Sequence, residues 1–258
     1  MTVVALFTRP PEMPDPSGPQ SAPNALIRKL ERFSSFSDVE REAIGDLGAA
    51  SEWIAAGKPI INAGDGPVMV LPLLEGVACQ YQDFRDGRRQ ILSLLLPGDI
   101  CGGSGEVSGP ADYGVRSLSR VRIARIEAAR FIALLQAHPA ITIALTKSAL
   151  VDQAVQRAWI VNLGQRRGHE RIAHLICELA HRMSERGLLL SDGGFELPLT
   201  QQELGSMLGL TSVHTNRVLQ QLRAENLIAF HNGVVHIHDA ARLQALADFD
   251  AAYLSIPG

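Results

Sequence analysis

The side chains best suited to specific chemistry lie in one polar segment, residues 200–223. Its central member is Arg217, because a guanidinium can donate two hydrogen bonds to O6 and N7 of guanine, which gives about 1–3 kcal/mol of discrimination between bases. Ser212 and Val213 precede it. Ser212 can reach a base or a phosphate, and Val213 can pack against a thymine methyl group. These residue types predict recognition of a DNA sequence.

A second set of polar residues is predicted to contact phosphates or to flank the base readers. Its members are Thr200, Gln202, Thr211, His214 and Asn216. Phosphate contacts fix the register and orientation of a protein on the duplex, but they carry no sequence information themselves. The alternative interpretation of the segment is an ordinary pair of antiparallel helices with a solvated arginine.

Caps and glycines place these residues on two crossed helices. Thr200 begins a capping box, and Gly205 lacks a side chain where the helices must cross closely. Gly209 permits a left-handed turn, after which Thr211 can cap the second helix. A recognition helix over about residues 211–223 is therefore expected to enter the major groove with its N-terminal residues.

A hairpin and a last helix complete the predicted DNA-reading domain. Asn232-Gly233, within residues 227–238, is a strong signal for a two-residue hairpin turn, and this hairpin would be the wing of a winged helix. Asp239 can then cap a final amphipathic helix. The apolar positions of that helix are Leu243, Leu246, Phe249 and Tyr253.

The first half of the chain has the pattern of an all-β domain. Short apolar or β-branched runs between residues 54 and 126 are separated by turn signals, which is typical of a sandwich or barrel. Asp86-Gly87 is the predicted turn of one hairpin. Two short helices are expected within residues 24–47, and the proline-rich residues 1–22 are expected to form a flexible tail. The predicted fold class is α+β, with a jelly-roll-like sensor.

A long helix is predicted between the two halves. Pro139 in its first turn and Gly164 just beyond its end delimit about seven turns. Two alternative seams along it favour a dimer, and neither register is preferred. One seam runs through Ile141, Leu145, Ser148, Asp152, Val155 and Trp159, and the other through Ala144, Ser148, Val151, Val155 and Ala158.

The charge, cysteine content and motifs of the chain limit the kinds of molecule that it is expected to bind and the reactions that it is expected to catalyse. The net charge of −3 gives no bulk attraction to nucleic acid, so local donors must provide it. Three widely spaced cysteines fit neither a disulfide framework nor a zinc site, so we expect a reducing cytoplasm and no metal. No apolar run reaches the ~18–20 residues of a membrane span, and no membrane partner is expected. Phosphate-loop, nucleophile-elbow and metalloprotease motifs are missing, so we expect no enzyme.

Residues 24–247 together resemble the Crp/Fnr family of transcription regulators. The likeness is strongest over residues 199–228, and weaker over 95–100 and 115–118. It implies a cyclic-nucleotide-binding-like β-roll over residues 23–137, a dimerisation helix over 138–164 and a winged helix-turn-helix over 165–258. It also implies a homodimer that binds a palindromic site in double-stranded DNA and contacts RNA polymerase.

The recognition helix departs from the usual pattern of the family at its start. Family members commonly carry Ser-Arg-Glu-Thr there, whereas residues 211–214 are Thr-Ser-Val-His. Arg217 does match the later arginine of the family. The usual half-site of the family therefore cannot be assumed for this chain.

The effector signature of the family is incomplete. Members that bind cyclic AMP carry Gly-Glu and then Arg-Ser, and Gly105-Glu106 match the first pair. Arg116-Ser117 match the second pair in one of two registers. In the other register Asp112 stands there, and its carboxylate would repel a phosphate.

Other sensor chemistry has weak support in the sequence. Residues 1–78 contain no cysteine for an iron–sulfur cluster, and Cys101 is either a redox thiol or a small buried hydrophobe. We therefore expect no cofactor and leave the effector unassigned. The alternative function is a cyclic-nucleotide-binding module that serves protein contacts and does not read DNA.

Overall fold

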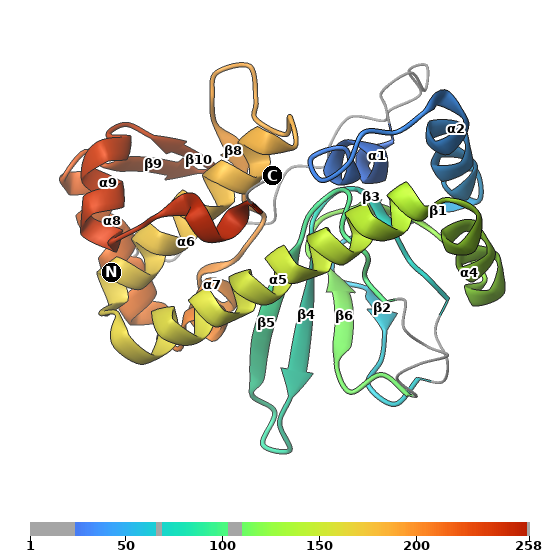
Figure 1. Cartoon of the computed structure of the whole chain (residues 1–258). Coiled ribbons are helices and arrows are strands. Elements are labelled where there is room, and N and C mark those ends of the chain that lie inside the picture. Colours follow the sequence, from blue (N-terminus) through green and yellow to red (C-terminus); the bar gives the residue numbers. More distant parts are fainter. Residues whose placement is uncertain (1–23, 66–68, 103–109, 257–258) are drawn as a thin grey trace. The chain divides into compact units, whose positions relative to one another are not determined.

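The computed structural model describes residues 24–65, 69–102 and 110–256. Of these, residues 24–156 and 253–256 form one compact unit, and residues 157–252 form another (Figure 1). The boundary lies inside the long helix, so it differs from the predicted domain limits at 138, 164 and 258. The predicted tail, residues 1–22, lies outside the described residues.

Two short helices begin the first unit, as predicted. In α1 (Ala25–Leu30), the side chain of Asn24 caps the helix by accepting a hydrogen bond from the Leu26 amide at 2.9 Å. In α2 (Asp38–Leu47), Ser37 begins a capping box. Both helices pack against the start of the long helix through one apolar cluster. It consists of Leu26, Ile27, Leu30, Phe36, Ile44, Ile141 and Ala144.

Two antiparallel sheets form the β-roll. One has the order β1-β7-β3, with strands Ser51–Ile54, Val121–Ala124 and Leu73–Glu75. The other has the order β2-β6-β4-β5, with strands Pro59–Ile61, Gly114–Ser117, Ala78–Asp83 and Arg89–Leu95. β4 and β5 form the predicted hairpin, and Gly87 in its turn has a φ of 83°, which glycine adopts without steric cost.

A buried lysine joins three parts of the first unit. Lys29 Nζ lies 2.7 Å from Asp99 Oδ1 and 3.2 Å from Asp152 Oδ2. Asp99 also accepts a hydrogen bond from the Leu96 amide at 2.8 Å. Lys29 and Asp99 are only 5% and 4% exposed, and an unpaired charge at such depth would be costly. The cluster therefore fixes α1, the turn after β5 and the long helix relative to one another.

The long helix α5 (Pro139–Gln165) follows α4 (Ala128–Ala137) and begins at Pro139 as predicted. It continues through Gly164, which was expected to lie just beyond its end. Neither predicted seam forms an outward-facing surface, because most of their members are buried within the single chain. The buried members are Ile141, Ala144, Ser148, Val151, Val155 and Trp159. The apolar side chains that α5 exposes are Ile143, Leu150, Ile160 and Val161.

No described helix alone is long and apolar enough to cross a membrane, and α4 and α5 pass that test only as a pair bent by 112°.

The second unit contains the predicted helix-turn-helix and its wing. After α6 (Gly168–Glu185) come the two helices α7 (Gln201–Leu208) and α8 (Ser212–Ala224). The wing strands β9 (Ile228–His231) and β10 (Val234–Ile237) turn at Asn232-Gly233, where φ is 52° and 75°. A short strand that the sequence does not predict, β8 (Phe195–Glu196), pairs with β10 and extends the sheet to the order β8-β10-β9.

The last predicted helix is shorter than expected. α9 (Ala240–Ala247) begins at Asp239, whose carboxylate accepts a backbone hydrogen bond at 3.0 Å, as predicted. It ends where Asp248 takes a left-handed φ of 46°. Phe249 and Tyr253 therefore lie beyond the helix, and the apolar periodicity overestimated its length.

A buried carboxylate connects the end of α5 to α6. Glu178, which has no exposed surface, accepts two hydrogen bonds at 3.1 Å from Trp159 Nε1. Arg182 Nη1 donates to Glu178 Oε1 at 3.3 Å and is itself nearly buried. The buried glutamate therefore accepts from both an indole N–H and a nearly buried guanidinium, so a charge and a donor that are shielded from water are hydrogen-bonded within the protein.

We predict that Glu178→Ala lowers the unfolding free energy of the second unit by about 3–5 kcal/mol, because it leaves a buried guanidinium without its carboxylate. Urea unfolding followed by circular dichroism measures this change. Glu185→Ala is the matched control on the same helix, since its contact with His181 at 3.4 Å is partly exposed and should contribute at most about 1 kcal/mol. Equal effects of the two substitutions would contradict the prediction.

Candidate nucleic-acid interface

The first helix of the motif begins with the predicted capping box. Thr200 Oγ1 accepts a hydrogen bond from the Glu203 amide at 3.1 Å, and Glu203 Oε2 accepts one from the Thr200 amide at 2.9 Å. The helix ends at Gly209, whose φ of 65° is left-handed. Both signals act locally, which explains why the sequence predicts the bounds of α7 correctly.

The close approach of α7 and α8 depends on a missing side chain. A Cβ at Gly205 would lie 2.6 Å from the Leu210 carbonyl oxygen and 3.1 Å from Thr215 Oγ1. Contacts under 3.0 Å to backbone cannot be tolerated, so any larger residue would push the helices apart. Thr215 is fully buried at this crossing, and the sequence analysis did not identify it.

The second helix has one buried face and one exposed face. Thr211 caps it, with Oγ1 accepting from the His214 amide at 3.2 Å. Val218, Leu219 and Leu222 point into the core, as predicted from their spacing. The predicted base readers Ser212, Val213 and Arg217 are all exposed, and Val213 shows 79% of its surface. An isolated valine that is so exposed is available for contact with another molecule.

Arg217 lies against a neighbouring imidazole on the exposed face. Its Nη2 is 3.3 Å from His214 Nδ1, one turn earlier on α8. The His214 ring is partly buried and lies close to the first residue of α6, because a Cβ at Gly168 would be 2.4 Å from His214 Nε2. The two predicted DNA-contacting residues are thus brought together, and a third helix limits where the imidazole can lie.

The remaining predicted flank residues differ in their exposure and in which of their hydrogen-bonding groups are already used within the protein. The Thr200 hydroxyl donates to Glu203 Oε2 at 2.9 Å, so its proton is already engaged in the cap. Thr211 uses its oxygen as an acceptor and keeps its hydroxyl proton for another partner. Gln202 is exposed and Asn216 is partly exposed. Their phosphate contacts stay a prediction.

Two arginines near the motif serve the fold, which the sequence analysis missed. Arg171 Nη1 donates to the Leu208 carbonyl at 2.9 Å, at the C-terminal end of α7. Arg166 donates to the carbonyls of Ala247 and Asp248 at 2.9 and 3.1 Å, at the end of α9. A cation at a helix C-terminus satisfies carbonyls that have no partner within the helix. These partners are distant in sequence, so no local signal could have found them.

The predicted effector residues are only partly described. Gly105 and Glu106 lie outside the described residues. The Ser117 hydroxyl donates to the Ala55 carbonyl at 2.7 Å and accepts from the Lys58 amide at 2.9 Å. Ser117 is fully buried, so these bonds hold the turn before β2 and leave no accessible hydroxyl for a phosphate. Arg116, beside it on β6, is partly exposed, but the pair does not fit the expected phosphate site.

The Cys101 thiol and the His174 imidazole are core groups. Cys101 is fully buried among the apolar side chains of the β-roll, and this burial raises the pKa of its thiol. This burial favours the interpretation of Cys101 as a small buried hydrophobe over a redox thiol. His174 is also buried, which lowers the pKa of its imidazole to about 4, and its ring meets the Phe249 ring edge-on at 5.4 Å.

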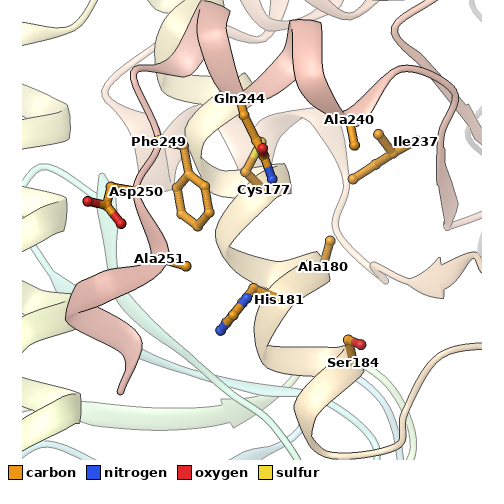
Figure 2. Close-up of a pocket in the computed structure, with 10 residues that line it drawn as sticks. All are labelled: Cys177, Ala180, His181, Ser184, Ile237, Ala240, Gln244, Phe249, Asp250 and Ala251. Carbon is orange, nitrogen blue, oxygen red and sulfur yellow. The ribbon is translucent and has the colours of Figure 1, made fainter. Parts of the chain in front are cut away.

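A cavity of about 520 Å³ lies in the second unit between α6, α9 and the segment after α9 (Figure 2). Its lining is Cys177, Ala180, His181, Ser184, Ile237, Ala240, Gln244, Phe249, Asp250 and Ala251. None of these residues belongs to the predicted DNA-reading set. Burial raises the pKa of the Cys177 thiol to about 12, so this group is not a nucleophile at neutral pH.

Comparison with known proteins agrees with both parts of this architecture. Residues 51–138 match the family model of the cyclic nucleotide-binding domain, and residues 170–246 match that of the Crp-like helix-turn-helix domain. The transcriptional activator protein FnrL of Cereibacter sphaeroides is 32% identical over 200 residues, which cover 76% of this chain and 79% of the relative. The nitrogen fixation regulation protein FixK of Bradyrhizobium diazoefficiens is 26% identical over 224 residues, 87% of this chain and 92% of the relative.

Solved structures share the fold. FixK2 from Bradyrhizobium japonicum superimposes with a TM-score of 0.67 at 22% identity, covering 76% of this chain and 96% of that one. A transcriptional regulator of the CRP family from Thermus thermophilus gives a TM-score of 0.62 at 22% identity, with coverages of 77% and 97%. The sequence identity to FnrL, the two domain matches and the shared fold show that this chain belongs to the Crp/Fnr family of DNA-binding transcription regulators.

Proposed function

We propose that the chain acts in the cytoplasm as a homodimer that reads a palindromic DNA site, with one α8 helix from each protomer. The observation that carries this proposal is the outward face of α8, where Ser212, Val213 and Arg217 are exposed in the first two turns. The N-terminal part of a helix is the part that reaches base edges in the major groove. Two such helices would enter successive major grooves about 34 Å apart.

Arg217 is the proposed principal base reader. Within the described part of the chain, no carboxylate pairs with it, and its contact with His214 uses only one of its two terminal nitrogens. A guanidinium has five N–H donors, so enough remain for both guanine acceptors. Val213 would add contact with a thymine methyl group, and Ser212 would add a hydrogen bond.

A second copy of the chain is the proposed partner of the exposed face of α5. Ile143 and Leu150 are both 52% exposed, and Val161 is 51% exposed. At 100° per residue, positions 143, 150 and 161 lie on one side of a straight helix. Apolar side chains on one side of a long helix are stabilised by burial against an identical helix across a two-fold axis.

The wider role that we propose is regulatory. FnrL is named a transcriptional activator, which supports the proposal that this chain, once bound to DNA, contacts RNA polymerase. The β-roll would receive the signal, and we propose neither a cofactor nor a reaction for it. The buried Ser117 hydroxyl argues against the phosphate site that a cyclic nucleotide would need.

Selection of bound duplexes from a random pool tests the proposed function. A sequence-specific dimer should enrich an inverted repeat, and its affinity should fall steeply with salt because phosphate contacts release counterions. A module that serves only protein contacts would enrich no sequence and would show no such salt dependence in a mobility-shift titration.

We predict that Arg217→Ala reduces the preference for one symmetric base pair of the selected site by about 1–3 kcal/mol, since it removes the bidentate donor. Mobility-shift titrations of the selected site and of its single-base variants measure this preference. Arg242→Ala is the matched control, because it removes the same charge from an exposed arginine on α9. An equal loss of affinity for all duplexes would contradict the base-reading role.

We predict that Leu150→Glu raises the dimer dissociation constant at least about 100-fold, since two copies of a buried leucine would be replaced by charges. Sedimentation equilibrium measures the constant. Val39→Glu is the control, because Val39 is 66% exposed and belongs to α2 and not to the proposed α5 interface. A Leu150→Glu protein that remains as dimeric as the control would overturn the assignment of this face.

A further inference from the structure

We propose that His214 is a positioning residue that aims Arg217 at its base pair, and that it does so only as a neutral imidazole. The inference rests on the proposed function, because it assigns the specificity of the same α8 surface to a second side chain. It also changes the role predicted for His214, from a contact with phosphate to an orienting contact within the protein. Sequence specificity would consequently depend on pH.

The contact between the two side chains fixes the protonation state of the imidazole. Arg217 Nη2 and His214 Nδ1 are 3.3 Å apart. A guanidinium can only donate hydrogen bonds, so Nδ1 must accept with its lone pair, and the ring proton must be on Nε2. A doubly protonated imidazole would instead place an N–H and a positive charge against the guanidinium.

The imidazole is held from two sides. Its own backbone is fixed at the start of α8, where the His214 amide donates to Thr211 Oγ1 at 3.2 Å. On the other side, the backbone of Gly168 at the start of α6 comes so close that a Cβ there would be 2.4 Å from His214 Nε2. That same Cβ would be 3.4 Å from Leu210 Cδ2, so Gly168 and Leu210 lie together beside the ring. The ring is therefore a fixed acceptor, which restricts the rotamers of Arg217 before DNA arrives.

The charged groups on the helices around His214 give its protonated form little support. In α7, in the first two turns of α8, and in the first turn of α6 with the residue before it, these groups are Arg217, Glu203, Arg167, His169, Glu170 and Arg171. The two carboxylates already serve as caps: Glu203 accepts from the Thr200 amide at 2.9 Å, and Glu170 accepts from the Arg167 amide at 2.7 Å. Three of the other four groups are arginines, whose positive charge would repel an imidazolium.

A pH-dependent preference follows from this arrangement. While the ring is neutral, Nδ1 accepts from Arg217 and the guanidinium keeps its orientation. Once the ring is protonated it repels Arg217, while the added charge strengthens attraction to phosphates everywhere on the duplex. The ratio of specific to non-specific affinity should therefore fall as the pH falls, even where total affinity rises.

The test measures this ratio for the full-length protein, using the selected palindrome and a variant changed at the base pair that Arg217 reads. For the wild type we expect the ratio to fall about fivefold between about pH 8 and about pH 5.5, the effect of losing one ordinary hydrogen bond. In His214→Asn the amide oxygen can take the place of Nδ1 without titrating, so the ratio should stay high at both pH values. In His214→Leu the ratio should be low at both pH values, because leucine has no acceptor for Arg217.

Gly168→Ala tests the same contact from another helix. Its methyl group must displace the imidazole, so the ratio at about pH 8 should fall about as far as in His214→Leu. Alanine is well tolerated in the first turn of a helix, and circular dichroism checks that the protein is folded. In the double variant Gly168→Ala/His214→Asn the shorter side chain avoids the methyl group, and the ratio should recover.

The outcomes separate this inference from the proposed function. His238→Asn, the same change at an exposed histidine after β10, should keep the wild-type pH dependence. If the wild type enriches a palindrome but His214→Leu retains the wild-type ratio and its pH dependence, the positioning role is overturned and the proposed function stands. If no sequence is enriched at any pH, the proposed function fails first.

Discussion

The close approach of Gly205 on α7 to the Leu210 carbonyl in the turn before α8, and to the Thr215 side chain on α8, is the constraint on which the DNA-reading surface depends. A Cβ at Gly205 would lie 2.6 Å from the Leu210 carbonyl, so this position must be glycine for the helices to cross where they do. The crossing buries Thr215 and the apolar face of α8, and it leaves Arg217 and Val213 on the outside. Without that approach, the same amphipathic helix would pack differently and present another set of residues.

Much of the positive charge near the motif serves the fold. A net charge of −3 gives no general attraction to DNA, and Arg166 and Arg171 direct their donors to the carbonyl ends of α9 and α7. Arg217 is different, because its described side-chain partner is the imidazole of His214 and not a carboxylate or a helix carbonyl. Recognition then depends on the placement of a few donors, which favours specificity over bulk affinity.

Buried polar groups determine how α5 is attached at each end. Lys29 holds Asp152 in the first unit, and Glu178 holds Trp159 in the second. The two contacts join α5 to segments distant in sequence, and each would be lost if the helix rotated. The rotation of α5 is therefore fixed within each unit, and this fixes which apolar side chains it exposes for a second copy.

The sequence by itself determined the elements whose signals are local. The caps at Thr200, Thr211 and Asp239 and the turns at Gly209 and Asn232-Gly233 all appear where they were predicted, because their hydrogen bonds join residues two to four positions apart. The exposure of the predicted base readers followed from the same helical periodicity.

Only the tertiary structure decided which partners meet across the chain. Apolar spacing could not show which side of α5 its own domains cover, so both predicted seams were buried faces. Likewise, the contacts of Ser117 with the turn before β2, of Arg171 with Leu208 and of His214 with Gly168 join positions tens of residues apart. Such contacts depend on how elements pack, and packing is a property of the whole fold that no local pattern encodes.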